Sequence, residues 1–129
     1  MPEMQMSAQE RQVLRDLARR VAEIAAAPEH AVKREWWRKH NRLERVKPMV
    51  LCSPEGSWCE LLPDDTLVTT DRWARGWEWH LRHLIYRWEH LRDDTVIEAV
   101  LKVGLHYSQS GWGFPLETVP STTARGEGK

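Results

Sequence analysis

Residues 71–94, DRWARGWEWHLRHLIYRWEHLRDD, form the stretch that decides the predicted fold. Apolar residues recur in it at steps of three and four, so in a helix they share one broad face while the charged residues lie opposite. Asp71 is a suitable N-cap, because its carboxylate can accept hydrogen bonds from the free N–H groups of the first turn. The stretch therefore predicts an amphipathic helix ending at Asp93-Asp94, with this apolar face: Trp73, Trp77, Leu81, Leu84, Ile85, Trp88 and Leu91.

Two apolar segments on either side of this helix predict strands. Residues 49–52, MVLC, follow Pro48, and their unbroken apolar character is typical of a strand buried on both faces. Residues 95–103, TVIEAVLKV, are rich in β-branched side chains. The connection is long enough to make the two strands parallel neighbours. Because two parallel strands leave both outer edges unpaired, we expect further strands from a larger barrel or sheet, or from a partner.

The residues before the first strand predict a helical hairpin. Ser7 and Glu10 form the capping-box pattern S-x-x-E at the start of a periodic apolar segment, which predicts a helix over residues 7–27. Pro28 suits the first turn of a second helix, over residues 28–44.

Length, charge and cysteine content bound the class of protein. The 129 residues suffice for one domain with its own core. We expect that domain at residues 7–119, between a flexible N-terminus at residues 1–6 and a disordered tail at residues 120–129. Basic and acidic residues both number 19, and this balance argues against nucleic acid or an anionic membrane as a partner. We expect the two cysteines to be free thiols in the cytoplasm, with neither a signal peptide nor a membrane span.

Several residues that could carry chemistry follow the predicted strands. Cys52 and Glu55 come at the end of the first strand, where parallel α/β folds place their ligands and catalytic groups. They could serve as metal ligands or as nucleophile and base, or they could be ordinary loop residues. Trp58 could be a pocket wall or a loop anchor. His106 follows the second strand and could reach the same place. Glu55 and His106 are thus the catalytic candidates, and Cys52 and Trp58 the substrate-binding candidates.

Three other features have competing interpretations. His80 and His83 are spaced to approach one metal, but the sequence offers no pattern that supplies further ligands, and both could simply line the helix margin. Glu98 lies among apolar neighbours, so it needs either a partner such as an arginine or a raised pKa. The tryptophans of residues 71–94 are expected in the core rather than on a stacking platform.

The order of these blocks resembles the N-terminal part of the uroporphyrinogen decarboxylase superfamily, especially its divergent members related to cobalamin-dependent methyltransferases. The resembling blocks are the two-helix lead-in, KPMVLCSPEGSWCELLP at residues 47–63, WEWHLRHLIYRWEHLRDDTVIEAVLKV at residues 77–103, and SGWG at residues 110–113. The resemblance implies an α/β fold, an incomplete (β/α)8 TIM-barrel fragment that holds about two parallel strands and an N-terminal helical hairpin.

The resemblance also implies a function. The decarboxylases hold substrate carboxylates with an arginine-rich loop after the first strand, but residues 53–57 read SPEGS, which argues against porphyrinogen decarboxylation. The methyltransferase branch uses zinc and a corrinoid, with metal ligands in later segments, so we expect no cofactor and no metal on this chain. We expect an inactive N-terminal fragment whose full-length relatives act in corrinoid-linked methyl transfer. Its partners would be the remainder of the barrel or a self-associating copy, and a corrinoid protein.

Two other functions fit the residues. The chain could be a non-enzymatic helical interaction module that binds a partner protein through its tryptophan stripe and the Trp36-Trp37 pair. It could also be a small metal-binding protein using His80, His83 and either Cys52 or Cys59.

Overall fold

The structure, a computed structural model, describes residues 6–104 and residue 113. This part of the chain is helical, and no strand occurs within it. Its elements are α1 (Ala8–Ala25), α2 (Pro28–Asn41), the 3-10 turn η1 (Glu55–Ser57), the one-turn α3 (Trp58–Leu61), the 3-10 turn η2 (Asp64–Thr66), α4 (Arg72–Tyr86) and the π-helical turn η3 (Arg87–Leu91).

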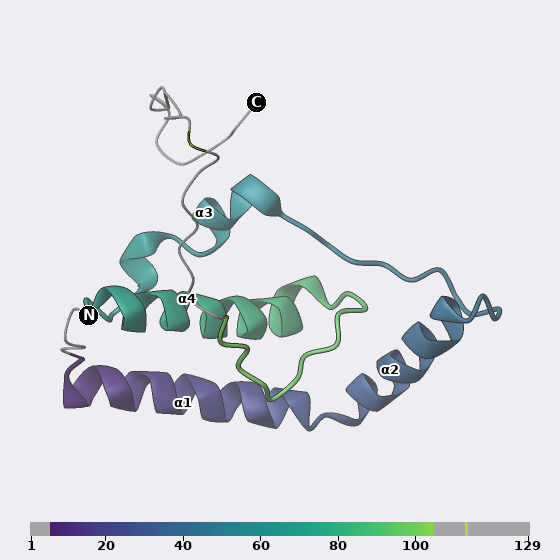
Figure 1. Ribbon diagram of the computed structural model, residues 1–129, viewed down its shortest axis with the longest axis horizontal. Coiled ribbons are helices and arrows are strands. Elements are labelled where there is room, and N and C mark those ends of the chain that lie inside the picture. The colour runs from purple at the N-terminus through teal and green to yellow at the C-terminus, as the bar shows by residue number, and fades with distance from the viewer. Residues whose placement is uncertain (1–5, 105–112, 114–129) are drawn as a thin grey trace.

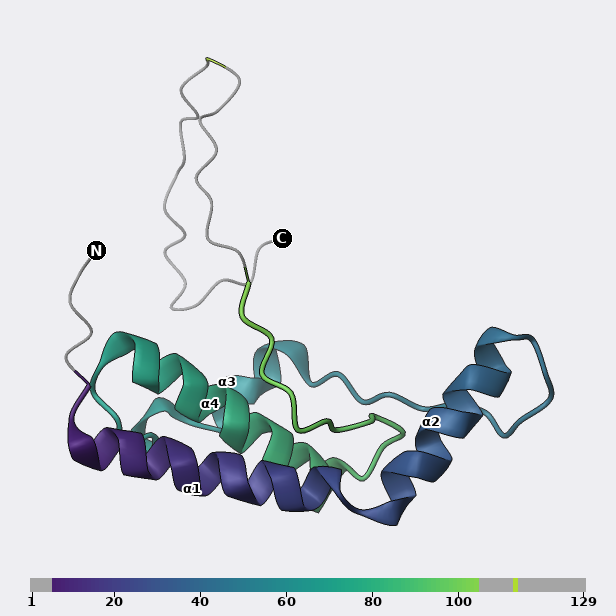
Figure 2. The ribbon, with the colours of Figure 1, turned by 60° about the horizontal axis from the view of Figure 1, so that its bottom comes forward.

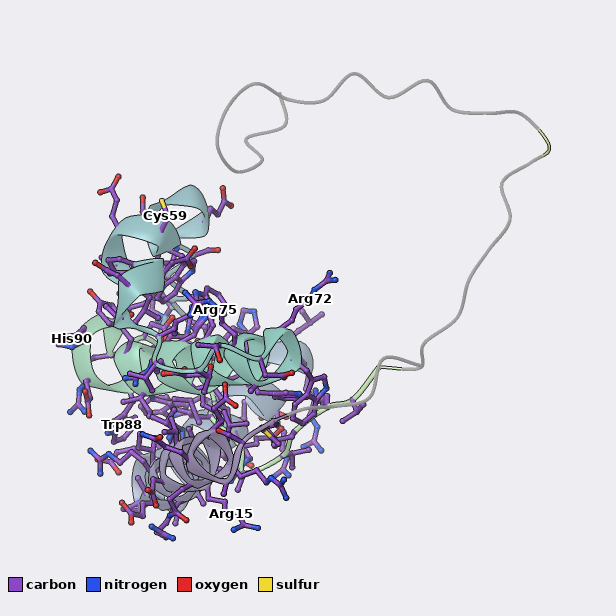
Figure 3. All side chains as sticks on the ribbon, turned by 90° about the vertical axis from the view of Figure 1, so that its left-hand side faces the viewer. Arg15, Cys59, Arg72, Arg75, Trp88 and His90 are labelled. Carbon is purple, nitrogen blue, oxygen red and sulfur yellow. The ribbon has the colours of Figure 1, made fainter. Side chains whose placement is uncertain are left out.

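Helix α4 is the central element of the molecule. Helix α1 runs along one side of α4 and α3 lies on the other side, while α2 leaves the end of α1 at an angle (Figures 1 and 2). Figure 3 shows Trp88 between α4 and α1, Arg15 on the side of α1 that faces away from α4, and Cys59 at the outer side of α3. The predicted hairpin of the first two helices is therefore wrong in its packing, because the partner of α1 is α4.

The core forms where α1, α4 and the extended chain after η3 meet. Its buried residues are Val21 and Ile24 from α1, Leu81 from α4 and Ile97 from the extended chain. Other apolar side chains pack around them: Leu14, Leu17, Ala18, Ala25, Leu84, Ile85 and Trp88. Burial of these apolar surfaces holds the two helices together, at roughly 25 cal/mol per Å² removed from water.

The capping box predicted for α1 is present. The Glu10 N–H donates to Ser7 Oγ (3.1 Å), and the Ser7 N–H donates to Glu10 Oε2 (2.9 Å). The second oxygen of Glu10 accepts hydrogen bonds from the N–H groups of Thr70 (2.7 Å) and Asp71 (2.9 Å). These backbone hydrogen bonds, from Asp71 first and then from Ser7 and Thr70, lower the pKa of Glu10 to about 2. One carboxylate thus joins the beginning of α1 to the beginning of α4.

The apolar face predicted for residues 71–94 is confirmed in its C-terminal half and wrong in its N-terminal half. Leu81 is buried and Trp88 packs against the core, but Trp73 is 49% exposed. The buried residues near the start of α4 are instead Ala74 and Glu78. The N-cap prediction is correct, since the Asp71 carboxylate accepts from the N–H groups of the second and third helical residues.

The predicted α/β fold class is wrong. Neither residues 49–52 nor residues 95–103 form a strand, and the first segment is joined to the turn at Asp93-Asp94 chiefly by carboxylates, in the places where a ladder would have backbone carbonyls. The Val50 N–H donates to Asp94 Oδ2 (2.8 Å) and the Cys52 N–H donates to Asp93 Oδ2 (2.8 Å), while only Asp94 N–H to Val50 O (2.8 Å) joins the two backbones. A helical chain whose described part contains no parallel strands gives no support to a TIM-barrel fragment. No helix in the described residues is long and apolar enough to cross a membrane.

Candidate functional site

Four of the residues singled out from the sequence, Trp37, Cys52, His83 and Glu98, line one groove, which we call the Cys52 groove. It has a volume of about 760 Å³ and lies between α2, α4 and the two extended segments. The residues that line it are Arg34, Trp37, Arg38, Leu51, Cys52, Ser53, His83, Arg87, Thr95, Val96 and Glu98. Three arginines and one imidazole therefore share a cavity with one carboxylate.

Arg87 is the most firmly placed cation of the Cys52 groove. Its side chain is only 13% exposed, and Nη2 donates to the Cys52 carbonyl (2.8 Å), to Thr95 Oγ1 (2.9 Å) and to the Asp93 carboxylate. Its Nε is buried without a hydrogen-bond partner. Arg87 thus clamps the end of residues 49–52 to the turn at Asp93-Asp94.

The two aspartates of that turn hold the wall of the groove. Burial alone would raise the pKa of Asp93, but hydrogen bonds from Cys52 and Thr95 and the Arg87 charge outweigh it and lower the pKa. The pKa of Asp94 is lowered, first by its hydrogen bond from Lys47. Both groups are therefore charged at neutral pH.

Helix α2 reaches the same turn through two side chains that donate to its carbonyls. Trp37 Nε1 donates to Asp94 O (2.8 Å), and Lys33 Nζ donates to Asp93 O (2.7 Å). Of the Trp36-Trp37 pair considered as a partner-binding feature, Trp37 is thus an internal anchor.

His83 forms the aromatic end of the groove. Its ring stacks on Trp58 with centroids 4.0 Å apart and meets the edge of Trp79 at 4.9 Å. Burial, followed by the charges of Arg87 and His80, lowers the pKa of His83 to about 4. The imidazole is therefore neutral at pH 7. No hydrogen bond joins the His83 ring to Cys52, although both side chains line the same groove.

The other predicted site residues are dispersed. Trp58 lies beside the groove, where its ring packs on His83, Trp79 and Tyr86 of α4. Glu55 is exposed at the start of η1, in the left-handed region at φ 47°. His106 lies outside the described residues. Glu98 has an arginine as its partner, as one of the two interpretations expected: its carboxylate lies 3.8 Å from Arg34.

The metal interpretation finds no ligand set within residues 6–104. His80 lines a different cavity from His83, and no three His, Cys, Asp or Glu side chains of the described chain gather closely enough to hold an ion. Both cysteines are free thiols, as predicted, and Cys59 Sγ donates to the Gly56 carbonyl (3.0 Å).

A second surface lies at the N-terminal half of α4, where the extended residues 96–103 cross Trp73 and Trp77. A cavity of about 600 Å³ borders one side of the crossing chain, where Val100 and Lys102 lie, and one of about 350 Å³ borders the other, where Leu101 and Val103 lie. We call the two cavities together the tryptophan surface. Three of its aliphatic side chains are exposed and close together along the chain: Val100 58%, Leu101 48% and Val103 80%.

Two buried polar residues, Glu78 and His30, were not predicted from the sequence. Glu78 is fully buried and accepts hydrogen bonds from Val68, Thr69 and Arg82. His30 is fully buried too: its Nδ1 accepts the Ile97 N–H (3.3 Å) and its Nε2 has no partner. The only sequence signal for Glu78 was Arg82 four residues later, a spacing that pairs side chains on a helix.

We predict that the fold loses stability between about pH 6.5 and pH 4. Burial, and then the charges of Lys33 and Arg34, lower the pKa of His30, and the pKa of His83 falls from 6.5 to about 4. Below pH 6.5 these two histidines bind protons in the unfolded chain but not in the folded chain, so the free energy of unfolding decreases as the pH falls. Urea denaturation at a series of pH values measures this. His83→Gln should flatten the slope, whereas the exposed His90→Gln should not, and equal slopes in all three proteins would contradict the assignment.

Comparisons with known proteins identify no relative of this chain. No protein-family model, no curated protein and no solved structure matches the chain.

Proposed function

We propose that the chain is a non-enzymatic helical association module that binds a polypeptide partner along residues 99–103. The observation that carries this proposal is the tryptophan surface, where an extended chain presents three half-exposed or more exposed aliphatic side chains. Apolar side chains gathered in this way on a surface are typical of protein interaction sites.

The backbone of the same residues supports the proposal. No hydrogen bond from or to the backbone of residues 99–103 joins them to the rest of the described chain. An extended segment with free N–H and C=O groups pairs readily with another extended chain, which gains backbone hydrogen bonds and buries alternate side chains.

The measurement that tests the proposal is the mass of the chain by light scattering over a range of concentrations. Wild type should show a concentration-dependent species larger than a monomer, and Leu101→Lys should shift that equilibrium at least about tenfold towards monomer, because it places a charge in the contact. Leu43→Lys is the matched control, since Leu43 is 95% exposed and lies outside the tryptophan surface. A chain that stays monomeric at every concentration contradicts the proposal.

A second proposal follows from the resemblance to the uroporphyrinogen decarboxylase superfamily. We propose that the chain is the N-terminal part of such a protein, that its relatives act in corrinoid-linked methyl transfer, and that it works in the cytoplasm. What supports this proposal is the resemblance itself, in residues 47–63, 77–103 and 110–113. The free thiols suit a reducing compartment.

An assay of methyl transfer from a methylated corrinoid tests the second proposal. The chain alone should be inactive, whereas a longer protein that contains it should transfer the methyl group. Activity of the chain alone, or no activity of the longer protein, would overturn it.

A further inference from the structure

The segment that crosses the tryptophan surface has a self-complementary charge pattern. Residues 98–102 read Glu-Ala-Val-Leu-Lys. When two copies of this segment run antiparallel about Val100, Glu98 of each copy lies opposite Lys102 of the other, and Ala99 lies opposite Leu101. Opposite charges that face each other across two strands stabilise the pair, and like charges destabilise it.

The two charged residues are available for such a contact. Lys102 is exposed and has no ion-pair partner in the described part of the chain. Glu98 is 52% exposed, and its one contact, with Arg34, is long at 3.8 Å. A surface ion pair of this kind contributes about 0–1 kcal/mol, so it does not prevent Glu98 from facing a new partner.

We propose that the partner of the tryptophan surface is a second copy of this chain, paired antiparallel through residues 98–102 with Val100 at the twofold axis. This inference rests on the proposed association function and names its partner. The arrangement is isologous, so each copy contributes the same residues and the assembly closes as a dimer. A parallel arrangement in register would bring Glu98 against Glu98, which the charge pattern disfavours.

The side chains around the axis fit this pairing. Val100 and Lys102 lie on one side of the crossing chain, and Leu101 and Val103 lie on the other. In the paired arrangement the second strand lies along the backbone edge of the first, so each row gains the matching side chains of the other copy. The chain bends at Ala99, so the pairing requires this segment to straighten.

Cysteine cross-linking tests the register. In a Cys52→Ser, Cys59→Ser background, Val100→Cys places two thiols at the axis, where paired Cα atoms stand about 5.5 Å apart, within the range that a disulfide spans. Oxidation should therefore yield a covalent dimer of Val100→Cys. Val103→Cys, more exposed in the single chain, should not cross-link, because residue 103 lies away from its own copy in this register.

Charge exchange provides the second test, read as the dissociation constant of the dimer. Glu98→Lys should weaken dimerisation at least about tenfold, because it replaces two attractions with two repulsions. Adding Lys102→Glu should restore it, whereas Glu44→Lys should have no effect.

The outcomes separate this inference from the proposed function. Self-association that Leu101→Lys removes, but without cross-linking at residue 100 or rescue by charge exchange, would overturn the antiparallel register and leave the association function standing. The absence of any association would overturn both.

Discussion

Replacing Glu78 with alanine should destabilise the fold by about 3–5 kcal/mol. The side chain is fully buried. Its oxygens accept from the Val68 N–H (3.1 Å), the Thr69 N–H (2.8 Å), Thr69 Oγ1 (2.7 Å) and Arg82 Nε (2.8 Å). Alanine would leave all these donors without an acceptor, and an unsatisfied buried donor costs about 1–3 kcal/mol.

The pKa of Glu78 also shows that its surroundings stabilise the charged form. Burial on its own would raise the pKa of Glu78, but the hydrogen bonds from Thr69, Val68 and Arg82 outweigh burial and lower the pKa. The carboxylate is therefore retained as an anion that fixes residues 67–69 against α4. A domain of this size has a total stability of about 5–15 kcal/mol, so loss of the Glu78 carboxylate would remove a large fraction of that stability.

Urea denaturation followed by tryptophan fluorescence and circular dichroism measures this effect. Glu89→Ala is the control on the same helical run, because Glu89 is 42% exposed and pairs only with Arg20, at 3.2 Å. We expect the control to change stability by less than about 1 kcal/mol. Similar midpoints for Glu78→Ala and Glu89→Ala would show that the internal carboxylate contributes nothing beyond a surface ion pair.

Replacing Asp93 with alanine should cost about 3 kcal/mol or more. The carboxylate is 5% exposed, binds the N–H groups of Cys52 and Thr95, and pairs with Arg87. Without it, residues 49–52 lose a backbone anchor and the nearly buried guanidinium loses its counter-ion. Because removal of one partner leaves the other charge unpaired, the substitution should cost more than the pair itself contributes.

A double-mutant cycle checks this explanation of Asp93. Arg87→Met combined with Asp93→Ala should be less destabilising than the sum of the two single substitutions, by about 1–3 kcal/mol. Asp16→Ala serves as the control, since Asp16 is 52% exposed and pairs with Arg19 on the surface of α1. Strict additivity of Arg87 and Asp93 would contradict the proposed coupling.

Local signals in the sequence predicted the beginnings of helices well. The Ser7 and Glu10 capping box and the Asp71 N-cap depend on residues within three positions of each other, and both were correct. Pro28 likewise begins α2. Such interactions are fixed by the helix backbone itself, so a short pattern contains all the information needed.

The strands could not be predicted correctly because their partners are distant. Residues 49–52 and 95–103 have the apolar, β-branched character of strands, but neither segment forms a strand, and the second bends at Ala99. The pattern cannot reveal that Asp93 and Asp94, which looked like helix-ending residues, supply the acceptors for Val50 and Cys52. The fold class was predicted wrongly because carboxylates accept these hydrogen bonds where a sheet would have backbone carbonyls.

In the candidate site, too, residues marked by local sequence position were predicted, and a residue placed by contacts with distant residues was not. Cys52 and Trp58 were identified from their position after an apolar segment, and both lie in or beside the Cys52 groove. The sequence did not single out Arg87, which closes that groove by hydrogen bonds to Cys52 and Thr95, 35 and 8 residues away. Long-range contacts of this kind leave no periodic trace in a sequence.

The shared carboxylate of Glu10 has a consequence for how the protein tolerates shortening. Because the same group satisfies amides ahead of both long helices, unravelling of the first turn of α1 also releases Thr70 and Asp71. Proteolytic trimming that removes residue 10 would therefore leave the N–H groups of Thr70 and Asp71 without this acceptor, and would weaken the beginning of α4 as well as that of α1.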